Sequence, residues 1–247
     1  MKLFLIRHAQ STNNALAENP VNLEEYTASR EAEPPLTEIG LRQAQLLADY
    51  LAATQASDGT QDPKPHVDEG YSFTQLYCSP MLRTLQTAWP ISQAMGLQPE
   101  VWIDIHEHGG IFSGDPKTDS VVMAYGLTRQ QMAEQFPRYR LPETLATRGW
   151  WRGGYEEMEE CYARAQRVAD TLRTWAPERS EARIAFVSHG TFLDALIKAL
   201  LGHDFASQLY YTHYNTAITR IDFTPRGFLL LRYLNRIEHL PATLITR

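Results

Sequence analysis

Short apolar runs along the chain predict the strands of one sheet. Residues 2–6 and 183–187 are almost continuously apolar, which is typical of strands buried on both faces of a sheet. Residues 73–78 and 101–105 are two further strand candidates. The end of the chain, residues 217–234, has the pattern of two strands joined by a short turn, which predicts a final hairpin.

Helical repeats fill the spaces between these strands. Residues 37–53 have helical spacing and begin with a threonine suited to the N-cap. The Ser-Pro pair at residues 79–80 predicts a second helix with proline at its first position. Residues 156–175 predict a long amphipathic helix ended by Pro177, and residues 192–201 predict an apolar helix.

The alternation of strands and helices predicts an α/β sheet with crossover helices. We interpret residues 7–36 as a polar stretch followed by a loop with prolines, and residues 56–70 as a surface connection. Residues 109–155 lack a strand pattern and are rich in Gly, Pro, Arg and Trp, which predicts an insertion over the site. We therefore expect a single domain over residues 1–247, with a cap formed by residues 109–155.

The composition narrows the possible function classes. The chain has 247 residues, of which 43% are hydrophobic, enough for one large core. The net charge of −6 argues against nucleic acid or an anionic membrane as a partner. Cys78 and Cys161 do not suit a disulfide framework, so we expect two reduced, buried thiols. The first apolar run is too short for a signal peptide or a membrane span, which predicts a cytoplasmic protein.

Polar clusters directly follow three of the predicted strands: Arg-His at residues 7–8, a Ser-to-Arg segment at 79–83 and Ser-His-Gly at 188–190. Ligands of α/β sheets bind beyond the carboxyl ends of the strands, so we expect these clusters to lie together. A guanidinium matches the oxygens of a phosphate, and a neutral imidazole can act as a nucleophile. An isolated Arg-His pair would more simply be a surface cation beside a core histidine, so the surrounding motifs decide.

Four motifs, in order along the chain, resemble those of the histidine phosphatase superfamily, which includes the cofactor-dependent phosphoglycerate mutases. They are Arg-His-Ala-Gln-Ser-Thr-Asn-Asn at 7–14, Leu-Thr-Glu-Ile-Gly at 36–40, Ser-Pro-Met-Leu-Arg-Thr-Leu-Gln-Thr-Ala at 79–88, and Ser-His-Gly at 188–190. Ala9 stands where the family usually has glycine, and it requires a backbone conformation open to a residue with a Cβ. The resemblance implies a three-layer α/β/α sandwich around a mostly parallel sheet, phosphoglycerate mutase-like, with a cap insertion.

The resemblance also implies a mechanism. His8 would attack phosphorus and form a phosphohistidine, while Arg7, Arg83 and His189 surround the phosphoryl oxygens. Because His8 must be neutral to attack and His189 must be protonated or at least donate, the two histidines need different environments. The residues expected to bind the phosphate and the substrate are Arg7, Gln10 at the entrance, Ser11, Asn14, Thr37, Arg83, His189 and Gly190.

The leaving alkoxide needs a proton, and the resemblance points to Glu107 as the acid and base. Family members often place a Gly-x-bulky-x-Gly pattern at a fixed spacing after this glutamate, whereas here residues 110–114 have that spacing from His106. Either the loop is one residue shorter, or His106 takes the glutamate's place. We favour Glu107. The reserve candidates are Asp104, His106 and Asp115.

Two other patterns carry possible chemistry. His106 and His108 alternate along a predicted strand and would share a face, as metal ligands do, but no carboxylate or cysteine stands at a ligand spacing. We therefore expect neither a metal nor another cofactor. In the segments 138–140 and 150–152, cations stand beside aromatic residues, which makes them candidates for holding the rest of the substrate. The alternative is that the tryptophan pair pins the cap to the core.

The sequence thus predicts an enzyme, a phosphatase that hydrolyses a small phosphomonoester. A phosphoglycerate-type mutase would form the same phosphohistidine and return the phosphoryl group to a retained acceptor. An inactive protein that binds phosphorylated ligands would keep the pocket without turnover. The unpatterned residues 109–155 resemble a mutase cap poorly, which favours hydrolysis. The sequence indicates neither the physiological substrate nor the oligomeric state.

Overall fold

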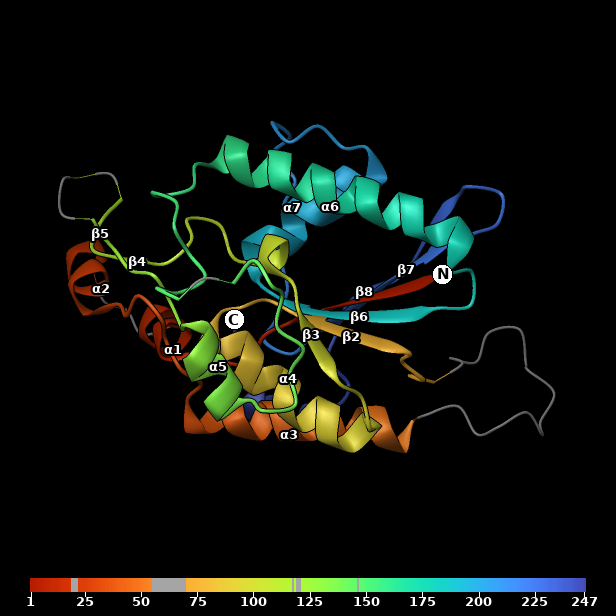
Figure 1. Cartoon of the computed structure of the whole chain (residues 1–247), viewed down its shortest axis with the longest axis horizontal. Helices are drawn as coiled ribbons and strands as arrows, with labels where there is room; N and C mark the ends of the chain where they lie inside the picture. Colours follow the sequence, from red (N-terminus) through yellow and green to blue (C-terminus); the bar gives the residue numbers. More distant parts are fainter. Residues whose placement is uncertain (19–21, 55–69, 117, 119–120, 146) are drawn as a thin grey trace.

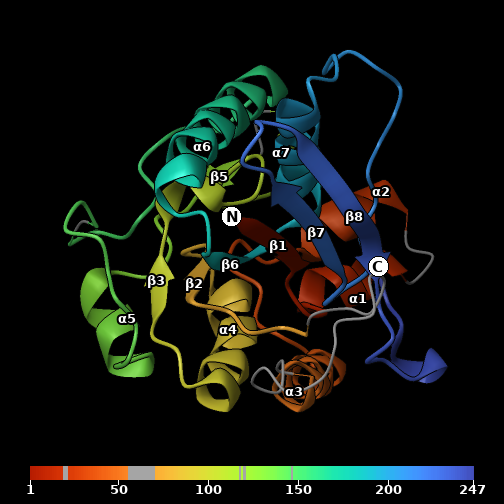
Figure 2. The same cartoon turned by 90° about the vertical axis from the view of Figure 1, so that its right-hand side faces the viewer.

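A six-stranded, mostly parallel sheet forms the centre of the molecule (Figures 1 and 2). The computed structural model describes residues 1–18, 22–54, 70–116, 118, 121–145 and 147–247. Neighbouring strands follow the order β3-β2-β6-β1-β7-β8. The first four are parallel, β7 is antiparallel to β1, and β8 is antiparallel to β7. The strands are β1 (Lys2–Arg7), β2 (Gln75–Cys78), β3 (Pro99–Val101), β6 (Arg183–Ser188), β7 (Ile218–Phe223) and β8 (Leu229–Arg236).

Helices cover both faces of this sheet, which confirms the predicted three-layer sandwich (Figure 1). The helices α3 and α4 lie on one face, and α6 and α7 lie on the other. Alternate residues of β1 explain the two layers, because Phe4 and Ile6 join the core beside α3 and α4 while Leu3 and Leu5 join the core beside α6 and α7. These helices are α3 (Glu38–Ala53), α4 (Leu82–Met95), α6 (Met158–Glu178) and α7 (Gly190–Leu201).

Two short helices lie where the sequence pattern predicts a polar stretch and a loop. They are α1 (Thr12–Glu18) and α2 (Leu23–Ser29). Each has only seven residues and α1 buries none of them, so no apolar periodicity marks either helix. The cap segment also has regular structure that the pattern does not predict. It holds β4 (Phe112–Ser113), β5 (Val122–Met123) and α5 (Arg129–Gln135).

The predicted strand over residues 101–105 is wrong. β3 ends at Val101, whose N–H donates to the Arg140 carbonyl at 2.9 Å, and a 3₁₀ helix, η1 (Ile103–Ile105), follows. The apolar residues of η1 do not continue the sheet because the chain turns there, with the His106 N–H donating to the Ile103 carbonyl at 3.2 Å. Residues 106 and 108 therefore follow a turn, and the strand periodicity does not apply to them.

Two proline positions also differ from prediction. α4 begins at Leu82 with Met81 as its N-cap, so Pro80 lies before the helix; the Ser79 hydroxyl accepts the Met81 N–H at 3.3 Å and forms a turn there. At the other end of the sandwich, α6 runs past Pro177 to Glu178. Proline disrupts the hydrogen bond to the preceding turn, and the helix ends one residue later.

Several other sequence predictions agree with the described residues. Thr37 caps α3, its hydroxyl accepting the Gly40 N–H at 3.0 Å, and the final strands β7 and β8 form a hairpin. Cys78 and Cys161 are buried and free. A second 3₁₀ helix, η2 (Ala242–Leu244), follows β8.

One predicted segment is not described by the structure. Residues 56–69 of the predicted surface connection lie outside the described residues. In the part of the chain that the structure describes, no helix is both long enough and apolar enough to cross a bilayer.

Candidate active site

Three neighbouring strands end together and bring the polar clusters to one edge of the sheet. Arg7 is in register with Ser188, and Cys78 is in register with Val187. The parallel ladder continues past the strand ends, where the His8 N–H donates to the Ser188 carbonyl at 2.9 Å. The register of β1, β2 and β6 therefore places the three clusters beside one another, as the sequence predicts.

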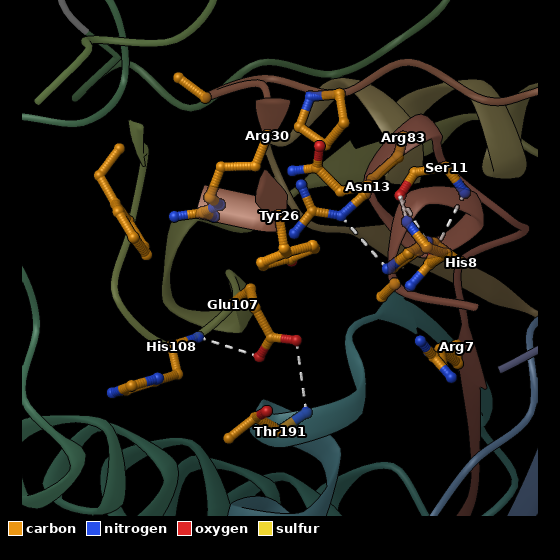
Figure 3. A pocket seen from close by; sticks show the side chains of 16 residues that line it. Arg7, His8, Ser11, Asn13, Tyr26, Arg30, Arg83, Glu107, His108 and Thr191 are labelled. Atoms are coloured by element: carbon orange, nitrogen blue, oxygen red, sulfur yellow. Dashed lines mark hydrogen bonds between the residues drawn. The ribbon is translucent and has the colours of Figure 1, made fainter. Parts of the chain in front are cut away.

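A pocket of about 310 Å³ opens at this edge (Figure 3). This volume is at the small end of the range for small-molecule sites. His189 does not line the pocket; it is fully buried behind His8, with the two ring centroids 5.2 Å apart. The predicted residues that line the pocket are Arg7, His8, Ser11, Asn14, Arg83 and Glu107.

His8 presents one ring nitrogen to a cation in the pocket wall. Its Nδ1 lies 2.7 Å from the Ala9 carbonyl, which can accept only if Nδ1 carries the proton. The other nitrogen, Nε2, accepts from Nε of Arg83 at 3.2 Å. Burial, then Arg83 and Arg7, lower the pKa of His8 well below its usual value. The ring is therefore neutral with its lone pair on Nε2, as a nucleophile requires. Ala9 lies outside the left-handed region, so its Cβ causes no backbone strain.

Burial and Arg83 act on His189 as they do on His8. Its Nε2 lies 2.8 Å from the Ser79 hydroxyl, and its Nδ1 is buried without a partner. Burial, then Arg83 and His8, lower the pKa of His189 well below its usual value. The structure does not give the two histidines opposite charge states, so His189 can serve as a neutral donor and not as a standing cation.

Acid is expected to destabilise the fold between pH 6.5 and about 5. Burial is the main cause that lowers the pKa of five histidines in the folded state, while the unfolded value stays near 6.5. Below that pH the unfolded chain binds more protons than the folded one, so the free energy of unfolding falls by up to about 1.4 kcal/mol per pH unit for each group. The five are His8, His106, His189, His213 and His239, the last two with a pKa of about 4.

Urea unfolding measured between pH 7.5 and 5 checks this. His239→Gln should flatten the pH dependence, because glutamine can still bond the Thr216 hydroxyl, 2.9 Å from Nε2 in the native protein, and does not titrate. His203→Gln, at an exposed position, is the matched control. A free energy of unfolding that stays constant or rises over this range would contradict the expectation.

Asn14 turns its amide NH₂ away from its protein partners. Its Oδ1 accepts from the Ser11 N–H at 3.1 Å, the Ser11 hydroxyl at 3.0 Å and Nδ2 of Asn215 at 3.3 Å. With the oxygen so occupied, the NH₂ group has no protein partner among the described residues. Since Asn14 lines the pocket, this arrangement offers a neutral donor to a phosphoryl oxygen.

Asn215 and Thr216 hold the segment that carries His8. The Asn215 amide also donates to the His8 carbonyl at 2.9 Å, and the Thr216 N–H donates to the Arg7 carbonyl at 3.1 Å. Thr216 has a φ of 61°, a strained value for a β-branched residue. The sequence does not predict this role for either residue, because neither belongs to a motif and a left-handed threonine leaves no sequence signal.

The carboxylate of Glu107 lies against the N-terminus of α7. Its carboxylate accepts from the backbone N–H groups of His108 at 2.9 Å, Phe192 at 3.0 Å and Thr191 at 3.3 Å. Figure 3 shows it facing the side of the pocket where Arg7 lies. Helix N-termini favour such a negative group, which explains why the side chain stays in this orientation.

A buried ion pair holds the backbone just before Glu107. The Arg164 guanidinium binds both carboxylate oxygens of Glu156, at 2.7 and 2.6 Å. Its NH1 also donates to the carbonyls of Asp104 at 2.8 Å and His106 at 2.9 Å. Arg164 is only 2% exposed, so α6 fixes the segment that places Glu107.

The geometry favours Glu107 over the reserve candidates. Of the four, Glu107 alone lines the pocket. His106 is buried against Trp150 and Trp151, with Nδ1 bonded to a carbonyl and Nε2 3.6 Å from Glu156. His106 and His108 have different neighbours, and no cluster of three or more His, Cys, Asp or Glu side chains suited to a metal ion occurs among the described residues.

Several predicted site residues lie outside the pocket. Gln10 is not at the entrance; its side chain accepts from the Thr37 hydroxyl at 2.6 Å and donates to Glu18. Thr37 acts as the α3 cap, and Gly40 is needed there because a Cβ would lie 2.0 Å from the Gln10 carbonyl oxygen. Gly190 begins α7 beside Arg7 without lining the pocket.

The cation–aromatic segments of the cap also do not line the pocket. The Tyr139 hydroxyl donates to a core carbonyl, that of Leu85, at 2.7 Å, and Trp150 and Trp151 pack against His106. Other residues, absent from the sequence prediction, line it. They are Asn13, Ala17, Tyr26, Arg30, Ala32, Pro34, His108, Gly110, Phe112 and Thr191.

Comparisons with known proteins identify the family of this chain. Residues 3–58 and 65–236 match the model of the histidine phosphatase superfamily (branch 1), which confirms the resemblance. The probable phosphoglycerate mutase GpmB of Yersinia pestis is 25% identical over 230 residues, covering 93% of this chain and 88% of that protein.

Solved structures share the fold. The structure of a putative alpha-ribazole-5'-P phosphatase from Escherichia coli has a TM-score of 0.59 and 19% identity, over 95% of this chain and 96% of that one. Phosphoserine phosphatase from Entamoeba histolytica, in complex with 3-phosphoglyceric acid, has a TM-score of 0.56 and 18% identity, over 97% and 99%.

Proposed function

Because this chain belongs to the histidine phosphatase superfamily (branch 1), we propose that it is a phosphomonoester hydrolase that works through a phosphohistidine on His8. One observation carries the proposal. The neutral His8 ring holds its Nε2 beside Arg83 at the end of β1, in a pocket that Glu107 also lines. A nucleophile, a cationic oxyanion site and an acid thus share one small cavity.

The proposed reaction has two steps. In the first, the Nε2 lone pair of His8 forms a bond to phosphorus while the bond to the ester oxygen breaks, and Glu107 gives that oxygen its proton. In the second, water attacks the phosphohistidine, Glu107 takes a proton from the water, and the P–N bond breaks to release phosphate. Arg7, Arg83 and the Asn14 amide bind the phosphoryl oxygens, and their preorganised charge stabilises both transition states.

The proposal includes three further predictions from the sequence. The chain is one domain with residues 109–155 as its cap, it works in the cytoplasm, and the reaction needs no metal. The last has a physical reason, because Arg7 and Arg83 already supply fixed positive charge where a metal ion would otherwise stabilise the transferred group.

Hydrolysis of p-nitrophenyl phosphate in excess EDTA tests the proposal. We expect steady release of nitrophenol and phosphate, unchanged by the chelator, and a phosphoenzyme that is stable in alkali and lost in acid, as a P–N bond is. Absence of phosphate release would contradict the hydrolase. Loss of activity with EDTA, restored by a divalent metal, would contradict the metal-free mechanism.

A mutase remains the second candidate, since a relative is named as a probable phosphoglycerate mutase. Both activities share the first step and differ in what attacks the phosphohistidine. Incubation with 3-phosphoglycerate, followed by separate measurement of free phosphate and 2-phosphoglycerate, decides between them. We expect free phosphate, whereas fast isomerisation with little phosphate release would favour the mutase.

A further inference from the structure

Arg30 adds a third cation to the pocket that holds Arg7 and Arg83. It follows α2, in the connection to α3, and its side chain lines the pocket (Figure 3). Its Nε is buried without a hydrogen-bond partner. Among the described residues it forms no ion pair with a carboxylate. A partly buried guanidinium in this situation is costly unless a ligand completes its surroundings.

Two aromatic residues fix the orientation of Arg30. The guanidinium carbon lies 3.8 Å from the centroid of the Phe112 ring, and Phe112 is in turn held edge-to-face by Tyr155, with centroids 4.9 Å apart. Tyr26, one turn earlier in α2, also lines the pocket beside Arg30. The Tyr26 side chain is also a hydrogen-bond partner of Arg30. Even with this contact, the guanidinium, which carries five N–H donors, presents an edge of the kind that binds carboxylates and phosphates.

The charges in the pocket leave Arg30 in excess. Arg7 and Arg83 match the two negative charges of a phosphoryl group. Glu107, whose carboxyl group also lines the pocket, is protonated when it acts as the acid of the proposed first step and then carries no charge. Burial is the main cause that lowers the pKa of Arg83; Glu107 and Glu33 oppose it, and Arg30 adds to it. Arg30 and Arg83 therefore repel each other in the free protein. A phosphomonoester without further charge would neutralise Arg7 and Arg83 and leave this third cation unmatched.

We propose that Arg30, held by Phe112 and Tyr26, forms a subsite for a second anionic group of the substrate. The preferred substrate is then a small phosphomonoester that also carries a carboxylate or a second phosphoryl group. The proposal rests on the proposed hydrolase function and deepens it. Under this proposal, Arg30, in the connection between α2 and α3, determines substrate selectivity. The arginines of the cap, which lie outside the pocket, do not.

Matched substrates test the subsite. Phosphoglycolate, ethylene glycol monophosphate and ethylene glycol bisphosphate share a two-carbon backbone and differ in a carboxylate, a hydroxyl or a phosphoryl group; 3-phosphoglycerate and glycerol 3-phosphate form a three-carbon pair. We expect kcat/KM to be at least about 30-fold higher for an acidic member than for its hydroxyl counterpart, as a charge-assisted contact predicts. Preference for the carboxylates or for the bisphosphate identifies which anion the subsite takes.

Arg30→Met is expected to reduce this preference to less than about 3-fold, a loss of about 10-fold or more in selectivity. The ratio does not depend on how much of the variant folds, so a stability loss cannot imitate it. Arg138→Met is the matched control, because Arg138 is an exposed cap cation bonded to Gln93 and should leave the ratio unchanged. An Arg30→Met enzyme that keeps the preference would overturn the subsite.

Failure of the inference and failure of the hydrolase give different results. An enzyme that hydrolyses p-nitrophenyl phosphate through His8 but treats acidic and hydroxyl substrates alike overturns only the subsite. An enzyme that hydrolyses none of these esters overturns the hydrolase. In that case calorimetric binding of 3-phosphoglycerate and glycerol 3-phosphate still tests Arg30, since tighter binding of the acid that disappears in Arg30→Met supports the subsite and equal binding overturns it.

Discussion

His8→Ala is expected to reduce kcat/KM for every phosphomonoester substrate by at least about 10⁴-fold, because it removes the atom that bonds to phosphorus. The other histidine that lines the pocket, His108, lies on the far side of Glu107 from His8 (Figure 3). The other motif histidine, His189, is fully buried behind His8, bonds to Ser79 and does not line the pocket. Water could attack only directly, without the covalent step that divides the barrier.

The measurement is steady-state turnover together with acid- and alkali-quenched phosphoenzyme. His8→Ala should form no phosphoenzyme yet still bind vanadate or phosphate, since Arg7 and Asn14 remain. Thermal unfolding shows whether the buried substitution keeps the fold. His203→Ala, at an exposed position, is the control and should retain full activity. Phosphoenzyme formed by the His8→Ala protein would contradict the assignment of the nucleophile.

The sequence predicts well which residues meet at the proposed catalytic centre, because they sit directly after buried strands. The apolar runs of β1 and β6 specify two central strands, and their parallel register then determines that His8 and Ser188 meet. The motifs add Arg83 and Asn14, both of which line the pocket. Gln10 is misplaced by the sequence prediction, because a motif gives position along the chain and not side-chain direction. Its side chain hydrogen-bonds Thr37 and Glu18 behind the site.

The sequence predicts the substrate side of the pocket poorly, for two physical reasons. α2 is too short to show periodicity, so Tyr26 and Arg30 are not recognised as pocket residues. In the cap, the sequence leaves open whether the tryptophans at 150–151 stack on a substrate or pin the cap to the core, because composition cannot distinguish the two uses. The structure shows that they pack around His106. Selectivity determined by such tertiary contacts is visible only in the folded chain.

Glu107→Gln is expected to reduce turnover in a way that depends on the leaving group. An alkyl phosphate leaves as a strongly basic alkoxide and needs a proton, so its kcat should fall by about 10²–10⁴-fold. Nitrophenolate leaves without a proton, so the first step with p-nitrophenyl phosphate should slow much less. The second step still lacks a base to activate water. The variant should therefore accumulate phosphoenzyme with the aryl substrate.

Rapid-quench measurement of a nitrophenol burst, followed by slow phosphate release, would separate the two steps. Glutamine keeps the size of Glu107 and one oxygen for the backbone N–H groups of α7, so the loss reports proton transfer more than placement. Asp104→Asn and Asp115→Asn are matched controls, because the sequence leaves both as possible acids and neither lines the pocket. An equal loss for alkyl and aryl substrates would assign Glu107 to binding, and a leaving-group-dependent loss in Asp104→Asn or Asp115→Asn would transfer the acid to that residue.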